Sequence, residues 1–300
     1  MIFSVVSPVF MVQKEPSSLI EKSNPSFTNQ AGNIDFNWWA VEHSTNDVAT
    51  EIASVVGSDN SVHVAYFDDV NDNIKYAYFD GVNWANETVW THGEVGGKSL
   101  IADLDIALDS NNFPFISFRD QPGADYLHIS DRQNGFWQNY SASFGQPMGG
   151  IENRIIIDSN DDLHVIHDEG GAVRYDFSSL TSSNTSPCPS STGIYSGGGT
   201  SFSLTSNGLP MIAFVDNMGN GNILKLAECT ATSQWIIQNI QTLNGGIFGL
   251  SLALDESDSP IFSYVDTAIT SELVYVEMNI SSNTWQTTGE RDRKENFIRN

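Results

Sequence analysis

The segment PFISFRD (114–120) decides the fold, because four related segments follow the same pattern elsewhere in the chain. They are HVAYFDD, HVIHDEG, PMIAFVD and PIFSYVD, and the five segments start at residues 63, 114, 164, 210 and 260. The starts are therefore 51, 50, 46 and 50 residues apart. Each segment opens with Pro or His, continues as an apolar β-forming run, and carries an acidic residue at or near its end. A regular period of this length predicts an array of similar structural units.

Each repeat contains three further strand-like segments in the same phase. A run such as DIALDSNN (105–112) precedes the central segment, and a run such as DYLHIS (125–130) follows it. A fourth run begins near a Trp in four of the five repeats, whereas the third repeat has a Ser/Thr/Pro-rich stretch at 178–191. These short runs, separated by Asp, Asn, Gly and Ser turns, predict four strands per repeat and no helix. Four-stranded units bury their faces by stacking around an axis, so we predict an all-β β-propeller.

The repeats define the expected domain boundaries. We expect one propeller domain over residues 1–300, with five complete blades at 46–290 and a C-terminal tail at 291–300. Residues 1–45 are expected to form a degenerate sixth blade or a leader, so a six-bladed ring is preferred. The alternatives are a five-bladed ring with an N-terminal extension and a fragment of a longer chain. Residues 1–12 are apolar and could equally be a strand pair or a degenerate signal peptide.

The charge of the chain restricts its partners. The sequence has 37 acidic and 13 basic residues, which gives a formal net charge of −24. Such a surface repels phosphate backbones and anionic membranes, so no nucleic-acid partner is expected. No apolar run approaches the roughly 20 residues needed to cross a bilayer, so no membrane insertion is expected either. Strong acidity with few Lys residues suits a saline or extracellular setting. The chain is expected to be a monomer.

The repeat pattern resembles that of a known class of proteins. A "LALD" strand, a "PxxSYxD" strand and a Trp-led strand are similar to the repeats of extracellular propellers from archaeal and bacterial surface proteins. That architecture is in turn similar to the sialidase-like propellers. The resemblance covers nearly the whole chain and implies a binding or adhesion module. The Asp-box turns of sialidases (Ser-x-Asp-x-Gly-x-x-Trp) are not found here.

Acidic residues near the end of the second strand form the first set of candidate ligand-binding residues. The turn after this strand is expected on the propeller face that usually holds ligands, where carboxylates could bind cations or sugar hydroxyls. The alternative is that each carboxylate caps its own turn. The candidates are Asp69, Asp120, Asp168, Glu169, Asp216 and Asp266.

Departures from the repeat form the second set. Arg119 stands where later repeats have Val, and Arg154 and Arg174 both belong to the third repeat. His167 is aligned with Tyr66, Ser117, Ala213 and Ser263. An enzyme would use such an Arg to hold a carboxylate and the His as a general acid or base. The alternative is solvated surface with local ion pairs.

No cofactor and no metal are expected. The turns at 109–112 and 158–162 are faintly similar to calcium-binding loops, but they lack the Gly and Glu of an EF-hand, so hairpin turns are the preferred interpretation. His63 and His164 are interpreted as structural replacements of Pro at the start of a strand. No cluster with zinc-ligand spacing occurs.

The two cysteines lie at similar points of neighbouring repeats. Cys188 follows the third strand of one repeat, and Cys229 lies at the corresponding turn of the next. We predict a disulfide between them, with two buried thiols as the alternative. A disulfide favours an extracellular location.

These observations lead to three functional hypotheses. The preferred one is a secreted or surface-exposed recognition module that binds carbohydrate or a protein partner. The first alternative is a polysaccharide-active enzyme, a glycoside hydrolase or lyase, with its site on the axial face of the second and third blades. The second alternative is a structural segment of a larger surface protein.

Overall fold

The computed structural model describes twelve stretches of the chain. They are residues 27–29, 32–34, 51–91, 103–120, 126–142, 149–169, 171–180, 184–195, 199–217, 222–267, 272–279 and 284–289. The chain forms two compact units, Met1–Thr91 and His92–Asn300. Each unit is described separately below.

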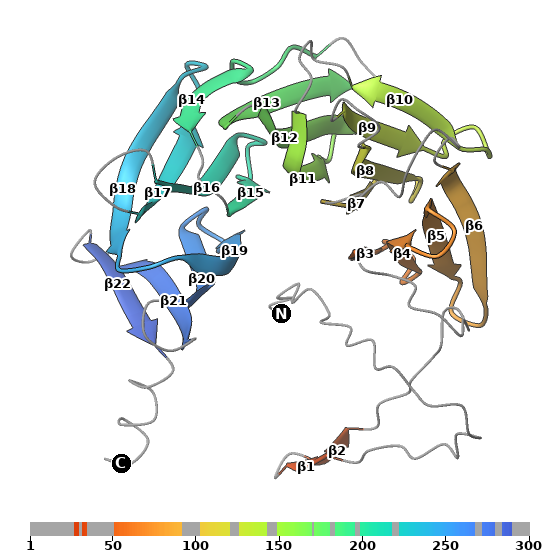
Figure 1. The fold of residues 1–300 in the computed structure, drawn as a ribbon, viewed down its shortest axis with the longest axis horizontal. Helices are drawn as coiled ribbons and strands as arrows, with labels where there is room; N and C mark the ends of the chain where they lie inside the picture. Colours follow the sequence, from red (N-terminus) through yellow and green to blue (C-terminus); the bar gives the residue numbers. More distant parts are fainter. Residues whose placement is uncertain are drawn as a thin grey trace. The chain divides into compact units, whose positions relative to one another are not determined.

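The first unit contains one complete four-stranded sheet, here called blade 1 (Figure 1). A separate short hairpin pairs β1 (Phe27–Asn29) with β2 (Gly32–Ile34). The strands of blade 1 are β3 (Ile52–Val56), β4 (Val62–Asp68), β5 (Asn73–Phe79) and β6 (Trp84–Thr91).

The second unit contains four more sheets of the same kind, here called blades 2 to 5. Blade 2 consists of β7 (Asp105–Leu108), β8 (Pro114–Asp120), β9 (Tyr126–Asp131) and β10 (Gln138–Ala142). Blade 3 consists of β11 (Gly149–Ile157), β12 (Asp162–Glu169), β13 (Ala172–Ser179) and β14 (Ser191–Tyr195). Blade 4 consists of β15 (Thr200–Leu204), β16 (Pro210–Asp216), β17 (Asn222–Cys229) and β18 (Trp235–Leu243). Blade 5 consists of β19 (Ile247–Leu254), β20 (Pro260–Asp266), β21 (Glu272–Asn279) and β22 (Thr284–Gly289).

Blades 2 to 5 follow one another as the blades of a propeller do. All strand pairs are antiparallel and sequential, and the first strand of each blade contacts the first strand of the next, from β7 through β11 and β15 to β19. Apolar side chains fill the spaces between these sheets. The predicted all-β propeller of four-stranded blades is therefore confirmed.

Both predicted blade numbers are compatible with the structure. Five four-stranded sheets are described, which is compatible with the preferred six-bladed ring and with the five-bladed alternative. The proposed sixth blade falls on residues 1–45, of which only 27–29 and 32–34 belong to the described residues. In the part of the chain that the structure describes, no helix is long and apolar enough to cross a membrane.

The core lies between successive sheets. Phe115 and Leu127 of blade 2 pack against Val165 of blade 3. Ile166 of blade 3 belongs to a second cluster with Phe214 of blade 4. Neighbouring residues of one strand thus face opposite blades, so both faces of each of these strands are buried and their sequences read as nearly continuous apolar runs.

A repeated turn between the first two strands sets the register of every blade. In blade 1 the backbone N–H of Gly57 donates to the carbonyl of Ser61, and in blade 3 Asp158 donates to Asp162. The same bond joins Asp109 to Phe113, Thr205 to Leu209 and Asp255 to Ser259. The residues that directly follow the accepting carbonyl of this bond are Val62, Pro114, Leu163, Pro210 and Pro260. His63 and His164 therefore do not replace Pro, and the predicted alignment of blades 1 and 3 was wrong by one residue.

The carboxylates in these turns serve the turns themselves. Asp109 Oδ1 accepts hydrogen bonds from the backbone N–H groups of Asn111 and Phe113, at 2.9 and 2.8 Å. Asp158 Oδ1 accepts corresponding bonds from Asn160 and Asp162, both at 2.9 Å. These contacts are those of capped hairpin turns, in agreement with the preferred interpretation of both segments.

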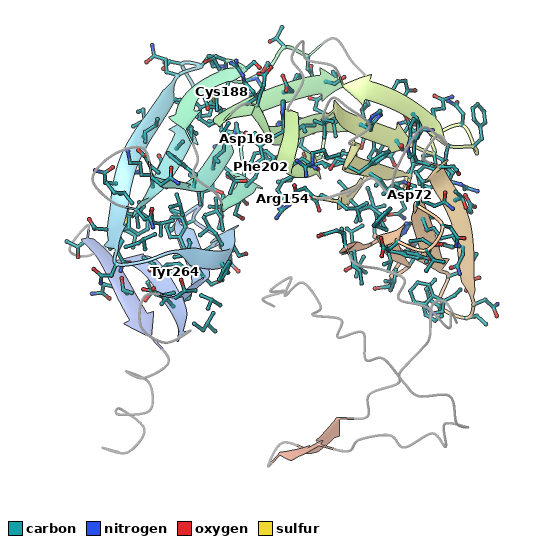
Figure 2. All side chains as sticks on the ribbon, in the orientation of Figure 1. Asp72, Arg154, Asp168, Cys188, Phe202 and Tyr264 are labelled. Carbon is teal, nitrogen blue, oxygen red and sulfur yellow. A yellow bond between two sulfur atoms is a disulfide. The ribbon has the colours of Figure 1, made fainter. Side chains whose placement is uncertain are left out.

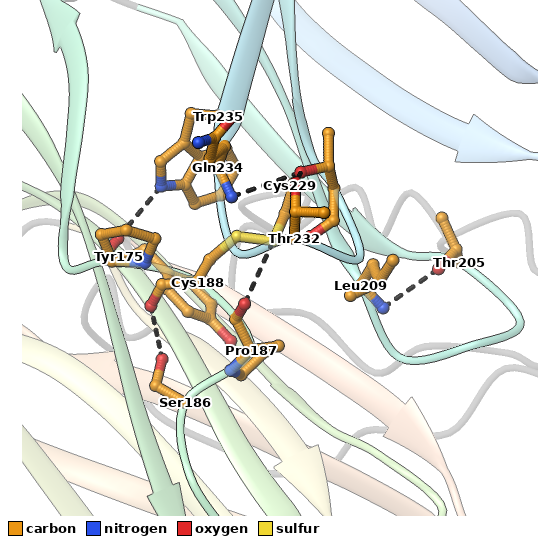
Figure 3. The surroundings of a disulfide bond; sticks show 12 residues. Tyr175, Ser186, Pro187, Cys188, Thr205, Leu209, Cys229, Thr232, Gln234 and Trp235 are labelled. Atoms are coloured by element: carbon orange, nitrogen blue, oxygen red, sulfur yellow. Dashed lines mark hydrogen bonds between the residues drawn. A yellow bond between two sulfur atoms is a disulfide. The ribbon is translucent and has the colours of Figure 1, made fainter.

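The predicted disulfide between Cys188 and Cys229 is confirmed (Figure 3). The two Cα atoms are 6.2 Å apart, and both side chains are buried. The bond joins the segment before β14 to the end of β17, so it crosslinks blades 3 and 4. Trp235 strengthens this junction, because its indole Nε1–H donates to the carbonyl of Pro189 at 3.0 Å.

Candidate functional site

Blade 3 differs from the other blades at one buried position of the second strand. The turn register places His167 of β12 at the position that an aromatic ring occupies in every other blade. These rings are between 0 and 4% exposed, and His167 is 3% exposed. They belong to Tyr66, Phe118, Phe214 and Tyr264. Apart from Tyr66, the residues predicted as equivalents of His167 were wrong, and the corrected comparison makes the replacement more unusual.

A second replacement in blade 3 accompanies the first. Asp176 of β13 pairs with Val165 of β12. At the corresponding position of the third strand, each of the other four described blades has a small or apolar residue. All four of these counterparts are fully buried, whereas Asp176 is 9% exposed. They are Ala77, Ser130, Ala227 and Val276. The sequence analysis did not single out Asp176, although a comparison of the third strands would have revealed it.

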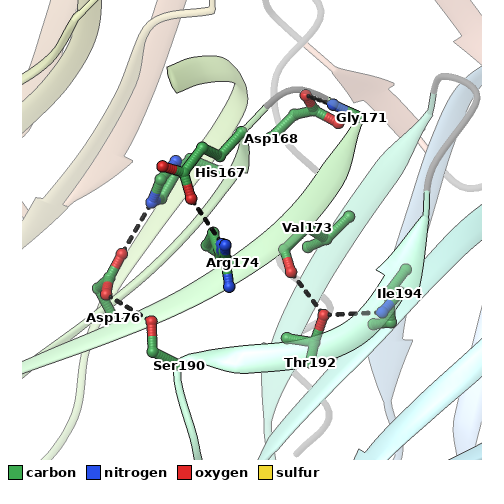
Figure 4. Close-up of polar contacts among 10 residues, drawn as sticks. His167, Asp168, Gly171, Val173, Arg174, Asp176, Ser190, Thr192 and Ile194 are labelled. Carbon is green, nitrogen blue, oxygen red and sulfur yellow. Dashed lines mark hydrogen bonds and ion pairs between the residues drawn. The ribbon is translucent and has the colours of Figure 1, made fainter. Parts of the chain in front are cut away.

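The two replacements contact each other (Figure 4). His167 Nε2 lies 2.8 Å from Asp176 Oδ2, and the hydroxyl of Ser190 donates to Asp176 Oδ1 at 3.0 Å. We call His167, Asp176 and Ser190 the blade 3 polar cluster. Nothing in the sequence pattern pointed to Ser190, because it lies in the irregular segment before β14. Asp176 thus uses both oxygens to fix its two neighbours.

The cluster lies in the interface between blades 2 and 3. His167 lies two residues after Val165 on β12, so the two side chains are on the same face of the strand. Val165 packs against blade 2, and His167 therefore faces blade 2 as well. On the other side of this interface, Arg119 of β8 is paired with Leu127, which packs against blade 3. The structure therefore brings Arg119 and His167, two of the predicted site residues, to the same interface.

Arg174 and Glu169 form an ion pair that recurs in the next blade. Arg174 Nε donates to Glu169 Oε2 at 2.6 Å, and Lys225 Nζ of blade 4 donates to Asp216 Oδ2 at 2.5 Å. Arg174 pairs with His167 across the strands, as Lys225 pairs with Phe214. The two ion pairs are therefore equivalent, and they are part of the blade pattern. Arg174 differs in keeping 35% of its side chain exposed.

Asp168 precedes Glu169 near the end of β12 and is labelled in Figure 2. It lies two residues after Ile166, so its side chain is on the face of the strand towards blade 4, opposite His167. It occupies the position of Arg119 and Val215 in the neighbouring blades. Burial raises the pKa of Asp168, and the hydrogen bond that its Oδ1 accepts from the Gly171 N–H at 2.8 Å partly opposes this effect. The carboxyl group is thus a turn cap, as the alternative interpretation expected, with a weakened acidity.

Arg154 is not part of the cluster. It pairs with Ile166, which faces blade 4, so it lies on the opposite face of blade 3 from His167. Its Nη1 donates to the carbonyl of Asn153 at 2.7 Å. Its charge also counteracts the effect of burial, which raises the pKa of Asp105. The predicted group of Arg119, Arg154, Arg174 and His167 is thus divided between two faces.

The remaining acidic candidates lie in separate blades. The register gives the terminal strand position to Asp68 rather than Asp69, and Asp68 Oδ1 caps its turn by accepting from the N–H groups of Val70 and Asn71. Asp266 ends β20 and pairs with Glu272. Asp120 ends β8, but its side chain is outside the described residues. Among the side chains that the structure describes, no three His, Cys, Asp or Glu are grouped to hold a metal ion.

Comparisons with known proteins identify the architecture. No protein-family model matches the sequence, and no curated protein does. The fold is similar to that of NanB solved with Optactamide, at a TM-score of 0.55 and 9% identity, covering 78% of this chain and 59% of that one. A point mutant of NanB sialidase from Streptococcus pneumoniae matches at a TM-score of 0.52 and 9% identity, with 81% and 60% covered.

A third structure, a protein of unknown function from Dyadobacter fermentans, matches at a TM-score of 0.50 and 11% identity, covering 80% of this chain and 82% of that one. The matches to NanB thus span about three fifths of its length. At these identities the likeness concerns the fold alone. The class of protein is a β-propeller of sialidase-like architecture. The predicted relation to archaeal and bacterial surface repeats stays a prediction.

Proposed function

We propose that this chain is a carbohydrate-recognition propeller, secreted or exposed at a cell surface, with its ligand site on blade 3 beside blade 2. The observation that carries the proposal is the exchange of an aromatic ring and a small residue for His167 and Asp176 in this blade alone. A buried polar pair stabilises a core less than well-packed apolar residues of similar volume. Proteins retain such local costs mainly where function requires them.

The groups around the cluster suit a polyhydroxylated ligand. Glu169 fixes the guanidinium of Arg174 through Nε, and among the described residues its two Nη groups have no hydrogen-bond partner. These nitrogens can donate to sugar oxygens. The likeness to NanB, which is a sialidase by name, supports carbohydrate as the ligand class. The disulfide supports a location outside the cytosol.

The test compares retention of wild type and variants on a panel of immobilised glycans. The double variant His167→Phe/Asp176→Ala gives blade 3 the side chains that blade 4 has, so it is expected to fold and to lose retention at least tenfold. Lys225→Gln, in the equivalent ion pair of blade 4, is the matched control and is expected to bind as wild type does. Full retention by the double variant would refute a ligand site at this cluster.

A second candidate function, polysaccharide cleavage, rests on the same contact. A carboxylate bonded to an imidazole orients it and stabilises its protonated form, which suits a general acid or base. Release of reducing ends or unsaturated products that disappears in His167→Phe/Asp176→Ala would establish this activity. Retention without any product from the bound glycan would exclude it in favour of recognition.

A further inference from the structure

The outer strand of blade 2 and the turn before it also depart from the repeat, at one exposed position each. In the register set by Trp137, Phe136 takes the place of polar Asn83, Gln234 and Thr284 of blades 1, 4 and 5. Tyr140 likewise takes the place of polar residues, namely Glu87, Gln238 and Thr288. Phe136 is 61% exposed and Tyr140 is 50% exposed. Aromatic rings in positions that are otherwise polar leave apolar area in water, which commonly marks a binding surface.

The polar groups between the two rings are held in place. The hydroxyl of Tyr140 donates to Gln138 Oε1 at 2.5 Å, which fixes the amide beside the ring. Gln138 is paired directly with Asp131 of β9. Desolvation of the Tyr140 hydroxyl and, after it, the buried Asp131 carboxylate raise the pKa of Tyr140. Within the described residues, the Nε2 group of Gln138 has no hydrogen-bond partner. The surface therefore offers two rings and an amide donor within one short segment.

We propose that Phe136, Gln138 and Tyr140 form a second carbohydrate-binding surface, which takes a neutral polysaccharide chain. The C–H faces of pyranose rings stack on aromatic rings, and their hydroxyls accept hydrogen bonds from amide groups. Residues 133–142 contain no charged side chain, and the adjacent Asp131 and Arg132 carry one charge of each sign, so the surface has no net charge to attract an anionic glycan. The two Cα atoms are at most about 14 Å apart, so one chain of a few sugar units contacts both rings.

This surface goes beyond the proposed function, because it lies on the outer strand of blade 2 and does not use the blade 3 polar cluster. It also differs in kind from the exposed aliphatic residues of the equivalent strand of blade 4. Ile236 and Ile237 are 54% and 41% exposed there, but they offer neither a flat ring nor a polar tip. The pair serves as a matched control for exposed apolar area.

The test is affinity electrophoresis of the full chain in gels that contain soluble neutral polysaccharides, including a β-glucan, a xylan and a mannan. Wild type is expected to be retarded by at least one of them. Phe136→Ala/Tyr140→Ala is expected to lose at least nine tenths of that retardation, and Tyr140→Phe only part of it. Ile236→Ala/Ile237→Ala is expected to migrate as wild type does in the same gel.

Each other result overturns the inference. Absence of retardation in every neutral gel would show that the surface does not bind this class of ligand. Undiminished retardation of Phe136→Ala/Tyr140→Ala would place any binding elsewhere. Circular dichroism and thermal unfolding confirm that the variants are folded, which is expected because both rings are mostly in solvent. Loss of retention only in His167→Phe/Asp176→Ala would support the blade 3 site and refute this one.

Discussion

Blades 3 and 4 share a backbone plan but use it differently. Their second and third strands pair in the same register, and both carry an ion pair between the third strand and the end of the second. At the centre of that pairing, blade 4 has Phe214 and Ala227, whereas blade 3 has His167 and Asp176. The comparison shows that the fold does not require a polar pair at this place. What blade 3 adds is therefore the best candidate for a function.

The largest effect is expected when the pair of blade 3 is transferred to blade 4. Phe214→His/Ala227→Asp removes a buried ring from the core that blades 3 and 4 share, and it buries a new carboxylate. We expect a loss of about 4 kcal/mol or complete unfolding, because cavity and desolvation costs add. Urea denaturation measures it, with Phe214→Leu as the milder control. A loss below about 1 kcal/mol would show that any blade accepts the pair.

The second largest effect on stability is expected from removal of the disulfide between blades 3 and 4. Cys188→Ser/Cys229→Ser is expected to lower the free energy of unfolding by about 3 kcal/mol, because the crosslink restricts the unfolded chain. Denaturant unfolding of the variant, with and without reductant, gives the value. Reduced wild type should match the variant, and the variant itself should not respond to reductant. Equal stability of oxidised wild type and variant would contradict the expectation.

Breaking the pair within blade 3 is expected to have a smaller effect. Asp176→Ala leaves His167 and Ser190 without their shared acceptor and should cost about 2 kcal/mol. His167→Phe/Asp176→Ala should recover at least the stability of wild type, because it restores the aromatic and small residues of the other blades. Thermal unfolding of both variants and of His167→Phe completes a double-mutant cycle. A double variant less stable than Asp176→Ala would show that blade 3 cannot accept the packing of blade 4.

The smallest effect concerns pH and a second His of blade 3. His164 Nδ1 lies 2.8 Å from the hydroxyl of Tyr175, and burial lowers the pKa of His164, as it does that of His63 in blade 1. Above pH of about 6.5 both states are neutral, so these groups add no pH dependence. Below that value the histidines of the unfolded chain take up protons more readily than those of the folded chain, so the free energy of unfolding decreases as the pH is lowered.

His164→Met, which copies Met211 at the equivalent position of blade 4, tests this difference between the blades. Thermal melting between pH 7.5 and 5.5 is expected to show a shallower decline for the variant than for wild type. An identical decline would mean that His164 does not resist protonation in the folded state.

Much of the fold could be predicted from local pattern. The repeat, four strands per unit and the pairing of Cys188 with Cys229 all depend on short segments whose spacing recurs, so each copy supports the others. The candidate site was predicted less well. His167 was selected for the right reason, a departure from the repeat, but with three wrong counterparts. Asp176 was overlooked because the third strands were not compared residue by residue.

The sequence by itself determined that the chain is a propeller of similar blades, because apolar period, turn residues and repeat length are local properties. Only the tertiary structure decided which residues are equivalent and which of them meet. Side chains alternate between the two faces of a strand, so an alignment error of one residue assigns every side chain to the wrong neighbour. The turn hydrogen bonds removed that error. With the register corrected, His167 stands in place of a buried ring and contacts the carboxylate of Asp176, which is 9 residues away in the sequence. Contacts across strands depend on pairing rather than on distance along the chain.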